Sequence, residues 1–178
     1  MSEIIDIEIV VDVNNLIANT SNPSKDPKNP TWVGHNYAYM IAANQYVKSG
    51  QATGDLSISA DVGDTIRWRV VSQSGNTSYS ANITNITYLS GTKITADTEG
   101  KLIQPQTPVP GTVPGTIALP PSGSNAYIAT QQYDFYVQAD VVTGGQENYS
   151  VLFEVLYYHG GSLSVIGYFA WDPALTAS

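Results

Sequence analysis

The sequence predicts an all-β fold: a single-domain antiparallel β-sandwich of about seven to nine strands with long proline-rich loops. Apolar and polar residues alternate with a period of two along most of the chain. Glycine- and proline-containing turns separate the alternating stretches, and no stretch shows sustained helical periodicity. The 178 residues can bury one sizeable core. We therefore place residues 1–178 in one sandwich domain.

The alternation is clearest at the start of the chain, where isoleucine and valine occupy every second position of residues 5–13. Residues 14–36 contain three prolines and many small polar residues, so we expect a long loop there. Further strands are expected where the apolar alternation of the first strand resumes. It restarts at Tyr37, Tyr39 and Ile41, continues at 56–62 and, after the turn Val62-Gly63-Asp64, returns at 65–70.

The second half of the chain alternates strands with one unusual loop. In residues 79–88 the apolar parity shifts between Ile83 and Ile86, which predicts a β-bulge. Residues 104–125 contain six of the ten prolines, so we expect an extended loop that forms no ladder. The last expected elements are a strand at 133–141 and a hairpin of 149–158 with 163–171, turning at His159-Gly160-Gly161-Ser162.

Four large aromatic side chains lie at alternating positions of these strands and should be buried. They are Trp68, Phe153, Phe169 and Trp171. The aromatic rings would supply much of the apolar area of the core.

The charge pattern excludes several classes of partner. Only 12% of residues are charged, the formal net charge is −8, and no lysine or arginine follows Lys101. A chain without a basic stripe has no attraction for phosphate backbones, so we expect no nucleic-acid binding.

No apolar run reaches the ~18 residues of a membrane span, so we expect no membrane insertion. The N-terminus lacks the pattern of a classical signal peptide, and a cytoplasmic protein is expected.

The sequence contains no catalytic motif, and we expect no enzymatic activity. There is no cysteine, which excludes thiol catalysis and cysteine metal sites. The two histidines, His35 and His159, lie in predicted loops, and no Gly-x-Ser-x-Gly elbow accompanies them. His159 is interpreted as an exposed residue at a hairpin tip.

The loop between the first two strands carries the candidate ligand-binding residues, which are Asp12, Trp32, His35, Asn36 and Tyr37. The ring of Trp32 could stack on a sugar, and the polar side chains could bind its hydroxyls. The alternative is a structural lid, in which Trp32 caps one end of the sandwich.

Asp12, Asn14 and Asn15 are candidate calcium ligands, because calcium prefers clusters of oxygen atoms. We expect no cofactor, and calcium at these three residues is the only candidate.

Few lysines are available to protect the edges of the predicted sheets. Lysine on an edge strand is a common protection against pairing between molecules. The low charge density also weakens repulsion between copies. We therefore expect a homo-oligomer.

Several segments of the sequence together resemble the PixA/AidA family of bacterial inclusion-body proteins. They are Ser21–Met40, Gly54–Leu56, Gly63–Arg69, Tyr149–Phe153 and Gly167–Pro173. The resemblance implies a non-enzymatic bacterial protein, abundant enough in some members to form intracellular inclusions. The expected function is a self-associating binding or assembly module. The alternative is a soluble lectin that binds glycans, with calcium assisting.

Overall fold

The computed structural model describes residues 2–111 and 127–177. It confirms the all-β class: strands β1 to β14 account for most of the described residues, beside one short helix, α1 (Val13–Asn19), and one 3₁₀ turn, η1 (Asn44–Tyr46). Many of the strands beyond the expected number are only two to five residues long.

The chain divides into two compact units. Met1–Gly100 and Tyr136–Ser178 form the larger unit, and Lys101–Phe135 form the smaller one. The sandwich core lies in the larger unit. The smaller unit was expected to be part of the same domain and is described separately below.

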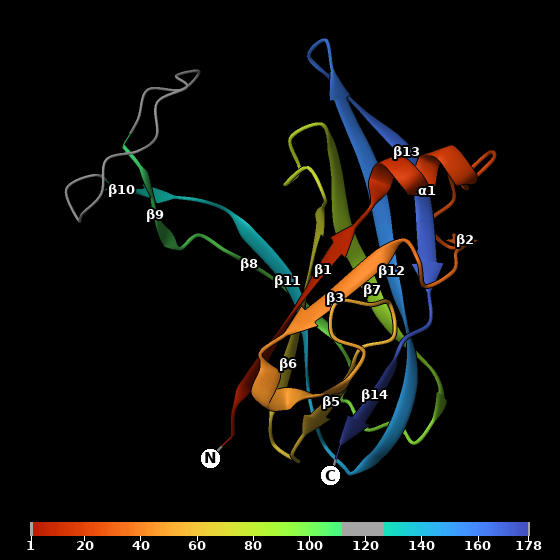
Figure 1. Cartoon of the computed structure of the whole chain (residues 1–178), viewed down its shortest axis with the longest axis vertical. Coiled ribbons are helices and arrows are strands. Elements are labelled where there is room, and N and C mark those ends of the chain that lie inside the picture. The colour runs from red at the N-terminus through yellow and green to blue at the C-terminus, as the bar shows by residue number, and fades with distance from the viewer. Residues whose placement is uncertain (1, 112–126, 178) are drawn as a thin grey trace. The chain divides into compact units, whose positions relative to one another are not determined.

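The first sheet of the sandwich has the spatial order β3-β1-β6-β11-β8 (Figure 1). Its strands are β3 (Ala38–Ala42), β1 (Ile4–Val11), β6 (Thr65–Ser72), β11 (Asp134–Asp140) and β8 (Glu99–Ile103). β1 pairs antiparallel with β3 but parallel with β6, from Ile4 opposite Thr65 to Val11 opposite Ser72. The long chain segment between β1 and β6 permits this parallel pair, which a tight turn could not connect.

The second sheet has the order β2-β13-β12-β14-β5-β4, and β7 pairs with the opposite side of β12 from β13. Its strands are β2 (Thr31–Trp32), β13 (Ser162–Trp171), β12 (Gly145–His159), β14 (Ala174–Ala177), β5 (Ser57–Ala60), β4 (Val47–Ser49) and β7 (Tyr79–Gly91). The pairs β13–β2 and β14–β5 are parallel. The sandwich is therefore mixed, although most of its strand pairs are antiparallel as expected.

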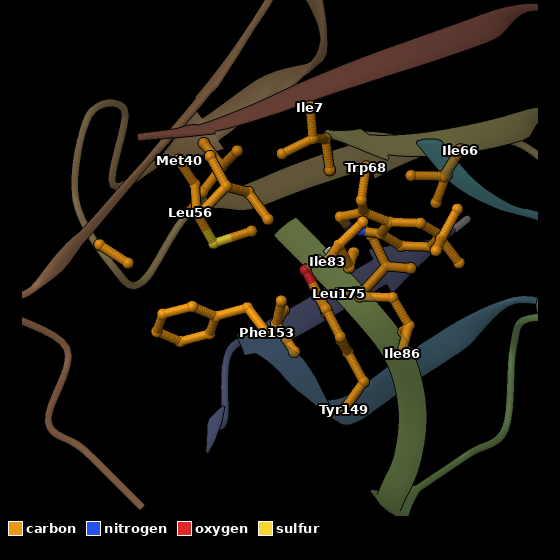
Figure 2. Packing of buried hydrophobic residues seen from close by; sticks show 14 of the residues in the cluster. Ile7, Met40, Leu56, Ile66, Trp68, Ile83, Ile86, Tyr149, Phe153 and Leu175 are labelled. Atoms are coloured by element: carbon orange, nitrogen blue, oxygen red, sulfur yellow. Dashed lines mark hydrogen bonds between the residues drawn. The ribbon is translucent and has the colours of Figure 1, made fainter. Parts of the chain in front are cut away.

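The inner faces of the two sheets meet in one core, which contains all four of the predicted aromatic residues. Trp68, Phe153, Phe169 and Trp171 are each 1% exposed or less. Figure 2 shows Trp68 of the first sheet lying against Tyr149 of the second. The Trp68 Nε1 donates to the Tyr149 hydroxyl at 3.3 Å. Complete burial raises the pKa of Tyr149, which keeps the hydroxyl protonated.

The predicted hairpin and bulge are both present. β12 and β13 form the hairpin, and its turn residues Gly160 and Gly161 have φ values of +58° and +82° (Figure 1). Positive φ at both positions suits glycine and gives the turn the twist of the flanking strands. In β7, Thr84 is the extra residue, because its neighbours Ile83 and Asn85 pair with consecutive residues of β12.

Two expectations about residues 14–41 were wrong. The predicted loop at 14–36 contains α1 and β2, because Asp12 caps a helix too short to show a periodic pattern. In β3 the buried residues are Ala38, Met40 and Ala42, not Tyr37, Tyr39 and Ile41. Both sets of alternate positions are apolar, and the tyrosines keep their hydroxyl ends near the solvent.

The smaller unit contains a two-stranded ribbon, which corrects the prediction of a loop without a ladder at 104–125. β9 (Gln106–Pro110) pairs antiparallel with β10 (Tyr127–Gln131), with Pro108 opposite Ala129. The two strand prolines, Pro108 and Pro110, occupy alternate positions, so the N–H groups they lack all belong to one side of β9. The other side remains able to pair. Residues 112–125 of the predicted loop lie outside the described residues.

Candidate functional site

Trp32 lies in an open groove on the sandwich. Its side chain is 55% exposed, although β2 is held beside β13 by a hydrogen bond from Val33 N to Ala170 O. The groove encloses about 420 Å³, and its walls come from the 28–32 segment, β7 and β12. Its lining residues are Lys28, Asn29, Pro30, Trp32, Thr87, Leu89, Ser150 and Leu152. A tryptophan this exposed does not cap the sandwich core, so the geometry does not favour the lid interpretation.

A compact turn positions the segment that leads to Trp32. The Asp26 carboxylate accepts hydrogen bonds from Lys28 N at 2.9 Å and from Asn29 Nδ2 at 2.6 Å. These bonds favour the charged form and hold the pKa of Asp26 below its usual range. The Lys25 Nζ donates hydrogen bonds to the carbonyl oxygens of Val165 and Ile166, which holds the same segment against β13. The groove is therefore built from an ordered turn.

His35 lies between two carboxylates. Its Nε2 is 3.1 Å from Asp172 Oδ1, and its Nδ1 is 2.5 Å from Asp55 Oδ1 without the alignment of a hydrogen bond. A Cβ added to Gly54 would lie 2.3 Å from the His35 carbonyl oxygen, so only glycine allows this approach. The arrangement holds three separate chain segments together. Both of its side-chain partners are carboxylates.

Among the other predicted residues, Asp12 and Asn15 contact the backbone and side chains around the start of α1. Asp12 N donates to Tyr37 O, and the Asp12 carboxylate accepts from Asn15 N at the start of α1. Asn15 Oδ1 in turn accepts from Asn19 Nδ2 at 2.8 Å. Asn14 borders a separate hollow of about 120 Å³, and Asn36 extends toward Gly34. Trp32, His35 and Asp12 thus each have a different set of contacts.

No group of three or more histidine, aspartate or glutamate side chains suited to holding a metal ion occurs within residues 2–111 and 127–177. This finding does not cover asparagine ligands, so calcium binding at Asp12, Asn14 and Asn15 stays a prediction.

Glu147 is a buried carboxylate that the sequence analysis missed. It is 2% exposed and accepts hydrogen bonds from Ile94 N at 2.7 Å, Thr95 N at 2.9 Å and Thr95 Oγ1 at 2.9 Å. The bonds fix the 92–98 segment, which borders a polar hollow of about 410 Å³. Glu147 has the inward parity of Tyr149 and Phe153, and this was the available signal.

The sheet edges are better protected than the scarcity of lysine indicated. On β3, Gln51 donates to Ala42 O and accepts from Ala42 N. On β7, Asn76 Oδ1 accepts from Ala81 N, and Thr98 Oγ1 donates to Ile86 O. These short polar side chains occupy backbone groups that another strand would otherwise bind. At these positions of β3 and β7 the edges are therefore protected without lysine, while the expected homo-oligomer stays a prediction.

Comparison with known proteins decides the family. The family model described as "PixA: Inclusion body protein" matches residues 3–177. The chain belongs to the PixA family of inclusion body proteins. A crystal structure of a PixA inclusion body protein from Burkholderia cenocepacia J2315 is 21% identical, with a TM-score of 0.80 over 99% of this chain and 96% of that one. At that identity the likeness shows the fold.

A second structure, the solution structure of Amebosin, is 6% identical over 84% of this chain and 100% of that chain, and its TM-score of 0.27 carries no argument. No curated protein matches the sequence. Among the described residues, no helix has the length and apolar character needed to cross a membrane.

The contacts of His35 join segments that carry the resemblance to the PixA family. His35, Asp55 and Asp172 come from three of the segments that carry the sequence resemblance. His159, by contrast, is exposed next to the hairpin turn, as expected, and its ring stacks on Tyr157 at 5.6 Å. The contacts of His35 support a structural interpretation for this residue, because it connects segments that are far apart in the sequence.

Proposed function

We propose that this protein is a self-associating assembly module whose folded copies associate into intracellular inclusions in the cytoplasm. The observation that carries the proposal is its surface, on which large apolar side chains are exposed and charges are few. The exposed apolar side chains include Trp32, Leu89, Ile128, Tyr158 and Leu163. Membership in a family of inclusion body proteins supports the same function.

Sedimentation velocity of the full chain over a range of micromolar concentrations tests this proposal. The expected result is a species larger than the 19.1 kDa monomer that increases with concentration. Sedimentation of a 19.1 kDa species alone at every concentration would contradict self-association.

We also propose that the protein is not an enzyme. A family described by its inclusion bodies supports a structural role. The polar clusters around His35 and Glu147 are occupied by contacts that hold chain segments in place. We therefore assign these groups to stability.

Glycan binding is a second candidate, favoured by the groove around Trp32. An exposed tryptophan beside Asn29, Thr87 and Ser150 can stack on a neutral sugar and bind its hydroxyls. A glycan array probed with the wild type and with Trp32→Ala tests this function, and Tyr158→Ala is the matched control because Tyr158 is also exposed. Binding that Trp32→Ala alone abolishes is the expected result. An array without binding by the wild type removes the candidate. Repeating the array with a chelator tests the assistance of calcium at Asp12, Asn14 and Asn15.

A further inference from the structure

The ribbon of β9 and β10 lacks a core of its own. Among its described residues none is buried, and Tyr127 and Ile128 are 47% and 58% exposed. A two-stranded ribbon is only marginally stable in water, whereas three or more strands with an apolar face can be stable. The ribbon therefore gains stability from any further strand that pairs with it.

The two edges of this ribbon differ in their ability to accept another strand. Proline has no N–H, so the pairs of Pro108 with Ala129 and of Pro110 with Tyr127 are those without hydrogen bonds inside the ribbon. The backbone groups at these four positions then point outward. The outer edge of β9 lacks two donors as a result, while β10 contains no proline and keeps every outward donor.

The chemistry of β10 favours a second copy of the same chain as its partner. The protein has a formal net charge of −8, yet residues 102–133 contain no charged residue. Two acidic copies can approach each other here without placing like charges together. In β10 the backbone groups of Tyr127, Ala129 and Gln131 point outward. When two β10 strands pair antiparallel with Ala129 opposite Ala129, Tyr127 of each copy lies opposite Gln131 of the other, so all three residues find partners.

We propose that two copies of this protein pair through the outer edges of β10, forming a four-stranded sheet of the order β9-β10-β10-β9. Val109 and Ile128 are cross-strand neighbours on one face of each ribbon, so the pair of ribbons carries one shared apolar face. The outermost strands are then the proline-containing ones, and the sheet stops growing at four strands. This inference rests on the proposed self-association and identifies one surface that contributes to it by pairing copies into dimers.

Sedimentation of proline variants tests the contact. Ala129→Pro removes one outward donor from each copy and leaves the bonds within the ribbon intact. Two hydrogen bonds are lost per pair, so the association should weaken by about tenfold to hundredfold. Gln106→Pro is the matched control, because Gln106 lies on the edge that the prolines already block, and its association should equal that of the wild type. The melting temperature of the sandwich should be the same in all three proteins.

A cross-linking experiment provides an independent readout that does not depend on the stability of the ribbon. The chain contains no cysteine, so Ala129→Cys introduces a unique thiol. Facing residues of a hydrogen-bonded antiparallel pair have Cα atoms about 5.5 Å apart, which suits a disulfide. Mild oxidation should give a covalent dimer for Ala129→Cys and only monomer for Gln106→Cys.

The outcomes separate this inference from the function on which it rests. Monomeric wild-type protein would contradict the proposed self-association itself. Wild-type protein that associates, while Ala129→Pro associates equally and Ala129→Cys forms no dimer, would overturn the β10 contact and leave self-association standing.

Discussion

Trp32 and Glu147 lie in contrasting environments. The candidate residue Trp32 is exposed in a groove, whereas Glu147 is buried and satisfied by three donor groups. Trp32 stood out in the sequence because it lies in a loop rich in turn-forming residues. Glu147 did not, because a single carboxylate in a strand belongs to no motif, although its parity placed it on the inner face.

Replacing Trp68 should cost far more stability than replacing Trp32. Trp68→Ala empties a packed site between the sheets and should lower the free energy of unfolding by about 3–5 kcal/mol. Trp32→Ala removes a side chain that is 55% exposed and should change it far less. Thermal melting of both variants measures the difference. Equal shifts in the two melting temperatures would disagree with the observed burial.

Glu147 should be the most important carboxylate for stability among those described. Glu147→Ala leaves the N–H groups of Ile94 and Thr95 without acceptors in a buried site, so we expect a loss of about 2–4 kcal/mol. The control is Glu154→Ala on the same strand, because Glu154 has the outward parity. Urea unfolding compares the two, and a Glu147→Ala variant as stable as the control would contradict this role.

At the level of elements, period-two alternation predicted the strands that form the core well. It located β1, β6 and the β12–β13 hairpin, because each presents one apolar face to the opposite sheet. Alternation could not predict the parallel pairing of β1 with β6, which depends on the path of the whole chain. It also could not predict α1, which is seven residues long and begins at the Asp12 cap.

The edges were misjudged because their protection comes from hydrogen bonds between distant residues. Gln51 caps Ala42 on β3, and Lys25 caps carbonyls of β13 that lie 140 and 141 residues away. A sequence contains no local signal for such contacts. For the candidate site, the sequence predicted Trp32 as a candidate but not the β7 and β12 residues that complete its groove.

Removing one edge cap should expose the sandwich to uncontrolled pairing. Gln51→Ala releases both backbone groups of Ala42, so we expect a loss of about 1 kcal/mol in stability. It should also aggregate faster on gentle heating, because an open edge accepts other strands. Light scattering compares it with Gln73→Ala, whose side chain is exposed. No difference between these variants would show that the Gln51 cap is unnecessary.

The whole molecule combines a net charge of −8 with an exposed apolar surface. Repulsion between acidic copies opposes their association, and dissolved salt screens that repulsion within about 10 Å at 0.1 M. The proposed contact at β10 contains no ion pair that salt could weaken. Charge and apolar surface therefore act in opposite directions on assembly.

Association should strengthen as salt is added. Titrating sodium chloride at a fixed protein concentration and recording the mean mass by light scattering tests this expectation. Lowering the pH toward the isoelectric point near 4.4 should act in the same direction, because the net charge falls. A mean mass that decreases with salt would indicate an interface built from ion pairs.

The central claim is that folded copies assemble reversibly, and dilution of assembled material tests it most directly. Assembled protein diluted to low concentration should return to particles of 19.1 kDa. The near-ultraviolet circular dichroism of the buried aromatic residues should be the same before and after dilution. Assemblies that lack this signal, or that never dissociate, would contradict the account by showing association of unfolded chains.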